Sequence, residues 1–356
     1  MKKVFVSGCY DILHGGHIEF FTQAKALGDY LIVCFAGDKA LLMHKGRKPS
    51  LPAEHKKRVL ESFLMVDEVV VGEGEEEGLD FKEHFLRIKP QILAVTEDDK
   101  YGEKKKALCA QIGAEHIVLP KTLSFQQIST SEILAFLKAP KEVPLRVDFA
   151  GGWLDVPKHA LEGGLVVNCS IEPLVSLESW VYEMGGGLGG SAAYAILTGK
   201  DGVKSELDLG VGWQDPAVIK ETGLCVWESG LKPKLHLKRS PKMLRGKMAL
   251  LWTGESHVTY EKVDLQRDYQ LILWAGRIAA RAVLNESYAG LCEAVDLSYK
   301  AQLDEGMQKL PTFAELAKKY CGGGWGGYAL FLFRTEGEKN EFLRRDRTLK
   351  IEPYIT

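Results

Sequence analysis

Short apolar runs alternate with amphipathic segments through the first 140 residues of the chain. The runs are rich in β-branched residues and have the length of buried strands. Strands that alternate with helices at this spacing form a parallel sheet with right-handed crossover connections. We therefore predict an α/β domain over residues 1–140, with its ligand site at the carboxyl ends of the strands. The predicted strands are residues 4–6, 30–35, 68–71, 92–95 and 116–119.

The chain changes character after a short polar stretch that carries Pro140 and Pro144. Two prolines just after a helical pattern are typical of a linker, and 356 residues are enough for two domains that each bury a core. The following sequence mixes strand and helix patterns between glycine-rich loops, so we predict an α+β domain over residues 141–356. The glycine-rich loops are residues 151–152, 185–190 and 322–327.

The first predicted strand leads directly into a segment that combines glycine with histidine. In it, His14-Gly15-Gly16-His17 opens the first predicted helix. The unpaired N–H groups and the positive dipole at a helix start attract phosphate, and glycine lets the backbone approach it. Nucleotidyl transfer suits such a site: the attacking phosphate needs no general base, but charge on the α-phosphate and pyrophosphate must be neutralised. The alternative is a glycine turn with incidental histidines.

A basic loop after the second predicted strand supplies further cations. Residues 44–49 carry Lys45, Arg47 and Lys48, which we expect to close over a triphosphate. The alternative is that these charges belong to a solvated surface. The candidate catalytic residues of the first domain are His14, His17 and Lys45.

These motifs resemble the cytidylyltransferase-like nucleotidyltransferases over the whole first domain. The resemblance rests on residues 8–17, 45–49, 95–99 and 128–133. It implies a Rossmann-like fold and transfer of a nucleotide's α-phosphoryl group onto a small phosphorylated acceptor. It also implies a helix near Ser129 that faces the phosphates, which fits a serine or threonine cap. The nucleotide-binding residues that it implies are Gly8, Cys9, Tyr10, Asp11, Gly16, Arg47, Lys48, Asp98, Asp99, Ser129 and Thr130.

Three glycine-rich segments carry the candidate chemistry of the second domain. Residues 144–157 predict a strand, a glycine turn and a carboxylate that can hold substrate hydroxyls. Residues 185–193 predict a glycine loop that runs into a helix, an arrangement that cradles phosphates. This second segment matches GxGxxG, but no βαβ pattern surrounds it, so we reject a dinucleotide site. Residues 321–327 precede an apolar strand.

In this order, the three segments resemble the GHMP kinases, and among these the sugar kinases. The resemblance extends to residues 163–168 and 212–215. It implies that Asp215 is the catalytic carboxylate beside a sugar hydroxyl and that Arg146 is its cationic partner. The alternatives are that Asp215, which precedes Pro216, is a turn or cap residue and that the glycine loops are connectors. The resemblance also implies substrate contacts from Asp155, Gly152, Gly323 and Gly324, nucleotide contacts from Gly187, Gly189, Gly190 and Ser191, and a metal contact from Ser191.

Composition limits the partners that we expect. Because 46 Lys and Arg face 48 Asp and Glu, no nucleic-acid partner is expected. The seven cysteines are scattered without a CxxC pair and indicate neither a disulfide framework nor a zinc site. No run approaches the roughly 18 apolar residues that span a membrane, and the start of the chain lacks a signal-peptide pattern. We expect a cytoplasmic enzyme without a membrane partner, and a homodimer remains open.

The two resemblances together predict a bifunctional enzyme. Its second domain would phosphorylate a sugar with ATP and Mg2+, and its first domain would convert a sugar phosphate to a nucleotide sugar with CTP or ATP. The second domain is short for its family, and no glutamate stands at the spacing where a second magnesium ligand is expected, Glu206 being the nearest. The alternative is therefore a nucleotidyltransferase whose kinase-like domain serves for binding or oligomerisation. An alditol or amino-alcohol phosphate is a third possible acceptor.

Overall fold

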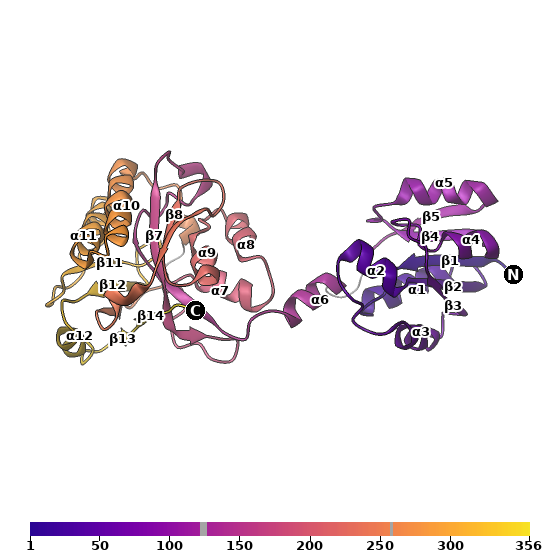
Figure 1. The fold of residues 1–356 in the computed structure, drawn as a ribbon, viewed down its shortest axis with the longest axis horizontal. Helices are drawn as coiled ribbons and strands as arrows, with labels where there is room; N and C mark the ends of the chain where they lie inside the picture. Colours follow the sequence, from indigo (N-terminus) through magenta and orange to yellow (C-terminus); the bar gives the residue numbers. More distant parts are fainter. Residues whose placement is uncertain (122–126, 257–258) are drawn as a thin grey trace. The chain divides into compact units, whose positions relative to one another are not determined.

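The computed structural model describes residues 1–121, 127–256 and 259–356. Its internal contacts divide the chain into two units, Met1–Leu134 and Ala135–Thr356 (Figure 1). Each unit has hydrophobic clusters of its own.

The first unit is built on a five-stranded sheet with the order β3-β2-β1-β4-β5. All of its strand pairs are parallel. The strands are β1 (Lys3–Gly8), β2 (Tyr30–Ala36), β3 (Glu68–Gly72), β4 (Ile92–Thr96) and β5 (Glu115–Leu119). The helices are α1 (Gly15–Lys25), α2 (Asp38–Lys45), α3 (Ala53–Glu61), α4 (Lys82–Ile88), α5 (Gly102–Ile112) and α6 (Thr130–Leu137), the last of which runs across the division between the units.

Helices cover both faces of this sheet, so the middles of its central strands are buried on both sides. In β2, Leu31 and Val33 pack with residues of α1 and α3, whereas Ile32 and Cys34 pack with residues of α4 and α5. Such strands appear in a sequence as continuous apolar runs because both faces are apolar. The predicted parallel α/β sheet is confirmed. Its switch point, where β1 lies between β2 and β4, is the place where open sheets of this kind bind ligands.

The second unit contains two antiparallel sheets. One has the order β11-β12-β10-β13, and the other has the order β14-β7-β8-β9 with β6 also paired to β7. The strands are β6 (Val143–Ala150), β7 (Leu165–Val175), β8 (Leu224–Glu228), β9 (Leu235–Arg239), β10 (Met248–Trp252), β11 (Ala317–Tyr320), β12 (Tyr328–Leu332), β13 (Thr348–Lys350) and β14 (Glu352–Pro353). The helices are α7 (Gly190–Leu197), α8 (Gly202–Asp208), α9 (Gln214–Glu221), α10 (Tyr269–Leu284), α11 (Tyr288–Asp304) and α12 (Glu336–Phe342), with short 3-10 turns at Pro157–His159, Pro241–Leu244 and Thr259–Lys262.

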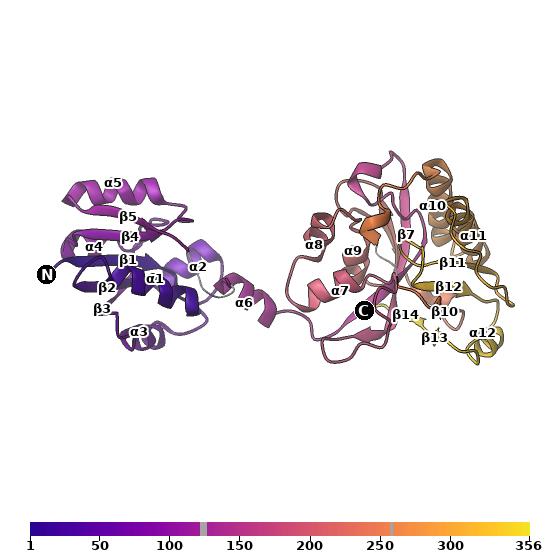
Figure 2. The ribbon, with the colours of Figure 1, turned by 180° about the vertical axis from the view of Figure 1, so that it is seen from behind.

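The core of the second unit surrounds β6 and β7. Both views show α7, α8 and α9 on one side of β7 and α10 with α11 on the other (Figures 1 and 2). Every residue of β6 is buried, including its charged residues Arg146 and Asp148. The predicted α+β character is confirmed. Because a fully buried strand holds charged side chains against the start of α7 and α9, the candidate kinase residues lie in a protected site.

Among the described residues, none of the helices combines the length and apolar character that crossing a bilayer takes. All seven cysteines are free.

Candidate active sites

His14 and His17 lie together at the start of α1, as the motif predicts. His14 is the cap residue, and its backbone N–H donates to Nδ1 of His17 at 3.3 Å. The two ring centres are 3.9 Å apart. The pKa of His17 is lowered to about 4, first by burial and then by the nearby His14 and Lys121. The pKa of His14 is also lowered, by burial and by Lys121. Both rings are therefore neutral near pH 7 and offer phosphate a hydrogen-bond donor rather than a charge.

The ring of Tyr10 packs against His17 of this pair. Its ring lies edge-on to His17 with ring centres 5.3 Å apart, and it packs in the same way on Phe21 of α1. A Cβ at Gly8 would lie 2.8 Å from this ring, so glycine is required there. Tyr10 is buried and its hydroxyl has no partner among the described residues. Tyr10, which the resemblance implied as a nucleotide contact, thus lies in the core behind His17.

Asp11 is fully buried and anchors the basic loop. It accepts hydrogen bonds from Nη1 of Arg47 at 2.5 Å and from the backbone N–H and hydroxyl of Ser50 at 2.8 Å each. Burial would raise the pKa of Asp11, but these bonds outweigh it and hold the pKa below its usual value. The structure therefore brings Asp11 and Arg47 together. The pair fixes the loop whose cations are candidates for the triphosphate.

The expectation that Lys45 lies in a loop is wrong. Lys45 is the last residue of α2, and Gly46 ends the helix in the left-handed region at φ +61° with its N–H bonded to Leu42 O. Glycine adopts this conformation without strain, so Gly46 ends α2 and Lys45 is its last helical residue. Lys45 and Lys48 are exposed, and the only loop cation held by a described carboxylate is Arg47.

The remaining predicted nucleotide contacts come from the ends of β4 and the start of α6. Ser129 caps α6, since its hydroxyl accepts the N–H of Glu132 at 3.2 Å, and this confirms the predicted cap. The hydroxyl of Thr130 donates to Ile12 O at 3.1 Å, which brings α6 beside the histidine loop. Asp99 forms an ion pair with Lys105 at 2.6 Å and is turned toward α5.

Lys121 is a cation of this site that the sequence analysis did not name. It forms an ion pair with Asp98, and its charge lowers the pKa of both His14 and His17. It lies two residues after the end of β5, at the carboxyl edge of the sheet. The sequence signal that could have identified Lys121 is its position just after a strand of the parallel sheet, where ligands bind.

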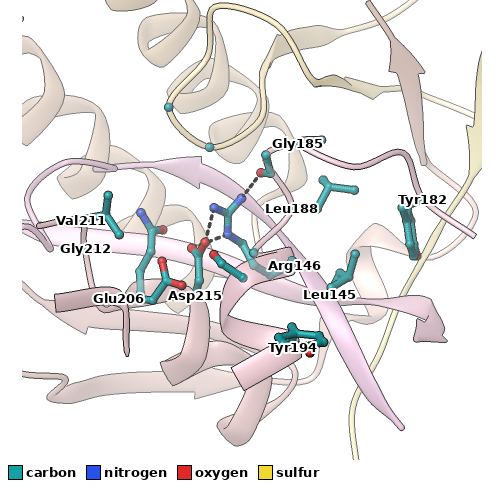
Figure 3. Close-up of a pocket in the computed structure, with 18 of the residues that line it drawn as sticks. Leu145, Arg146, Tyr182, Gly185, Leu188, Tyr194, Glu206, Val211, Gly212 and Asp215 are labelled. Atoms are coloured by element: carbon teal, nitrogen blue, oxygen red, sulfur yellow. Dashed lines mark hydrogen bonds and ion pairs between the residues drawn. The ribbon is translucent and has the colours of Figure 1, made fainter. Parts of the chain in front are cut away.

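The second unit contains a cavity of about 680 Å³ that gathers most of its candidate residues. Figure 3 shows the guanidinium of Arg146 directed at the carboxylate of Asp215, with Glu206 beyond Asp215 and Tyr182 at the opposite end. Arg146 binds Asp215 in a bidentate manner, with Nε–Oδ1 at 2.7 Å and Nη2–Oδ2 at 2.9 Å. Asp215 lies in the first turn of α9, and Arg146 lies on β6. Bidentate pairing fixes the carboxylate in orientation as well as position.

The glycine loop closes around this pair. The carbonyl of Gly187 accepts a hydrogen bond from Nη1 of Arg146 at 2.7 Å. Gly189 has φ +80°, and a Cβ there would lie 3.2 Å from Asp215. Glycine is therefore needed both for the turn and for the approach of the loop to the carboxylate. Of the other predicted glycines, Gly152, Gly190 and Gly323 line the cavity, whereas Gly324 does not and packs on Met307.

Asp155 is a buried carboxylate at the wall of the cavity. It accepts hydrogen bonds from the backbone N–H and the side-chain amide of Gln214, at 3.2 and 3.1 Å. Burial and repulsion from Asp215 raise its pKa to about 7. A Cβ at Gly212 would lie 1.7 Å from its Oδ2. Asp155 is thus held rigidly, and its proton is retained up to neutral pH.

Ser191 and Glu206 lie together at the same cavity. Ser191 is in the first turn of α7 and Glu206 is on α8; both line the cavity, and Ser191 is close enough to lower the pKa of Glu206. Burial and the nearby Asp215 raise the pKa of Glu206 to about 7, and its Oε1 is buried with no partner among the described residues. A hydroxyl and an unpartnered carboxylate oxygen are ligands that Mg2+ accepts, so these residues fit the expected ion. The described residues hold no group of three or more His, Cys, Asp or Glu that would bind a metal without the nucleotide.

The first unit has clear sequence relatives. The cytidylyltransferase-like family model matches residues 5–136. FAD synthase of Pyrococcus horikoshii is 37% identical over 135 residues, which are 37% of this chain and 89% of that protein. The chain belongs to the cytidylyltransferase-like family. FAD synthase of Pyrococcus abyssi is 38% identical over 135 residues, with the same coverage.

Two kinases are among the solved structures that match part of this chain. A mevalonate kinase matches 60% of this chain and 98% of its own length at 14% identity, with a TM-score of 0.46. A D-glycero-D-manno-heptose 1-phosphate kinase from Bacteroides thetaiotaomicron matches 60% of this chain and 95% of its own length at 15% identity, with a TM-score of 0.44. The cytidylyltransferase-like family model covers the first unit alone.

Proposed function

We propose that the chain is a bifunctional enzyme that phosphorylates a sugar and converts a sugar 1-phosphate to a nucleotide sugar. The observation that carries the proposal is the meeting of Arg146, Asp215, Ser191 and Glu206 with a glycine loop in one cavity. Asp215 supplies a base, Arg146 a cation, and the glycine loop a place for the phosphates. A domain that only bound a sugar or mediated oligomerisation would not need all three.

In the kinase step, the hydroxyl oxygen on the anomeric carbon of the sugar attacks the γ-phosphorus of ATP. A bond forms between these atoms, the bond from the γ-phosphorus to the bridging oxygen breaks, and ADP leaves. Asp215 accepts the hydroxyl proton, and Arg146 fixes its carboxylate by two hydrogen bonds. Asp155 orients the sugar by hydrogen bonding to its other hydroxyls.

Ser191 and Glu206 would hold Mg2+ together with the nucleotide. The ion, when bound, neutralises charge on the phosphates. Glu206 must lose its proton to act as a ligand, and its raised pKa makes this step sensitive to pH near 7.

In the transferase step, a phosphate oxygen of the sugar 1-phosphate attacks the α-phosphorus of the nucleoside triphosphate. A new P–O bond forms, the bond to the bridging oxygen of the β-phosphate breaks, and pyrophosphate leaves. The neutral rings of His14 and His17 donate to the phosphates, and Lys121 with the exposed Lys45 adds positive charge. No general base is required.

The test follows ADP and pyrophosphate release separately, with each nucleoside triphosphate and a panel of sugars and sugar phosphates. We expect ADP release with ATP and a heptose-like or fucose-like sugar, and a loss of roughly 100-fold or more in Asp215→Asn. Pyrophosphate release with a sugar 1-phosphate should persist in that variant. Asp208→Asn, an exposed carboxylate on α8, is the matched control and should retain both. If pyrophosphate were released but no sugar gave ADP, the kinase step would be refuted, and the second unit would serve for binding or oligomerisation.

A second acceptor is favoured by the sequence relatives, because the two quoted above are named FAD synthase. FAD is flavin mononucleotide joined to an adenylyl group, so flavin mononucleotide with ATP belongs in the same panel. Pyrophosphate release with flavin mononucleotide, and none with sugar phosphates, would replace the sugar as the acceptor of the first unit.

A further inference from the structure

Four charged side chains form a continuous buried series behind the cavity of the second unit. Lys319 of β11 forms an ion pair with Asp148 of β6, Asp148 lies 3.2 Å from Nη1 of Arg146, and Arg146 binds Asp215. The side chains of Lys319, Asp148 and Arg146 are 3 to 4% exposed. Asp148 and Lys319 do not line the cavity. Any effect of these two residues on the reaction must therefore pass through Arg146 or the neighbouring backbone.

Asp148 is the point at which the two sheets and the glycine turn meet. Its side chain accepts hydrogen bonds from Lys319 Nζ, from Arg146 and from the backbone N–H of Gly322, the last at 2.9 Å. Lys319 also donates to the Asp148 carbonyl at 3.1 Å. Gly322 lines the cavity. One carboxylate thus fixes both the guanidinium behind Asp215 and a glycine turn at the substrate site.

The charges of the series balance. Lys319 and Arg146 are matched by Asp148 and Asp215. Burial alone would raise the pKa of Asp148, but Lys319 and then Arg146 outweigh it and lower the pKa. Without Lys319, the carboxylates of Asp148 and Asp215 would compete for the single guanidinium of Arg146. Lys319 satisfies Asp148 and leaves the Nε edge of Arg146 for Asp215.

We propose that Lys319 and Asp148 are positioning residues that hold Arg146 in register with Asp215. The kinetic part of this proposal rests on the proposed kinase function. Preorganisation of this kind acts on turnover more than on nucleotide binding, because it sets the angle of the reacting carboxylate and not the affinity of the cradle.

The kinetic test compares Lys319→Met, Asp148→Asn and the double variant. We expect kcat for ADP release to fall roughly 10- to 100-fold in Lys319→Met, with the KM for ATP within about twofold of its original value. The double variant removes one charge of each sign, so it should regain thermal stability but not kcat. Recovery of kcat in the double variant would show that charge balance alone matters and would overturn the proposal.

Lys318→Met is the matched control. Lys318 is the neighbouring lysine of β11, is also buried (8% exposed, against 3% for Lys319), and bonds to Glu315 at 2.8 Å instead of to the site. The Lys318→Met variant should be less stable than the original protein but should keep its kcat for ADP release. Pyrophosphate release by the first unit should be unchanged in all of these variants.

A spectroscopic test decides the proposal even if no sugar is turned over. The Nε–H of Arg146 donates to Asp215 at 2.7 Å and should give a protected, shifted arginine signal in a ¹⁵N-correlated NMR spectrum, assigned by its loss in Arg146→Lys. We expect Lys319→Met to shift this signal and speed its hydrogen exchange, and Lys318→Met to leave it unchanged. An unaltered Arg146 signal in Lys319→Met would refute the positioning role. Absence of ADP release in the unaltered protein would instead refute the kinase function.

Discussion

Replacing Asp155 by asparagine should change how the stability of the second unit depends on pH. The pKa of Asp155 is about 7 in the folded protein because the carboxyl is buried and faces Asp215, whereas an unfolded aspartate titrates near 3.9. Well below pH 3.9 both states are protonated, and well above pH 7 both are ionised. As pH rises between these values, the unfolded state loses its proton first, so the folded state is progressively destabilised.

The shift of about three pKa units corresponds to about 4 kcal/mol. Asp155→Asn removes this loss, and its amide still bonds to Gln214 after rotation. Its free energy of unfolding relative to the original protein should therefore rise by about 3 kcal/mol between pH 4.5 and pH 8, because about 1 kcal/mol of the loss has already occurred at pH 4.5. Urea unfolding followed by tryptophan fluorescence measures this unit alone, because all seven tryptophans lie in it. Asp208→Asn is the control and should run parallel to the original protein. Parallel curves for Asp155→Asn as well would refute the reasoning.

Three further outcomes are expected. Gly212→Ala should lower the stability of the second unit by at least about 2 kcal/mol, since its Cβ would lie 1.7 Å from Asp155; an unchanged melting temperature would contradict this. Asp11→Asn should raise the KM for the nucleoside triphosphate in pyrophosphate release, because Arg47 loses its carboxylate, while ADP release is unchanged. The ratio of ADP release to pyrophosphate release should fall from pH 8 to pH 5.5, because Glu206 and Asp155 become protonated below about 7 while His17 stays neutral down to about 4; a constant ratio would count against this assignment.

The features that the sequence predicts well are those set by local pattern. The buried strands of the first unit are continuous apolar runs because helices cover both faces, and His14 stands at the start of α1, where the motif predicts the first helix to begin. Lys45 was misplaced although Gly46 carried the helix-end signal. Glu206 and Lys319 depend on tertiary approach: Glu206 meets Ser191 from another helix, and Lys319 meets Asp148 across 171 residues of chain. No spacing in the sequence reports such contacts.

Burial has the same consequence in both units. It favours the uncharged form of an ionisable group that has no oppositely charged partner, so His17 is held neutral, and Asp155 and Glu206 keep their protons up to about pH 7. Groups that do have fixed partners, such as Arg146 with Asp215 and Asp148 with Lys319, remain charged in the same surroundings. The paired charges therefore fix the positions of side chains in the site. The groups without a charged partner can change protonation when a ligand binds, because a bound phosphate favours an additional proton on His17 and a bound cation favours the loss of one from Glu206.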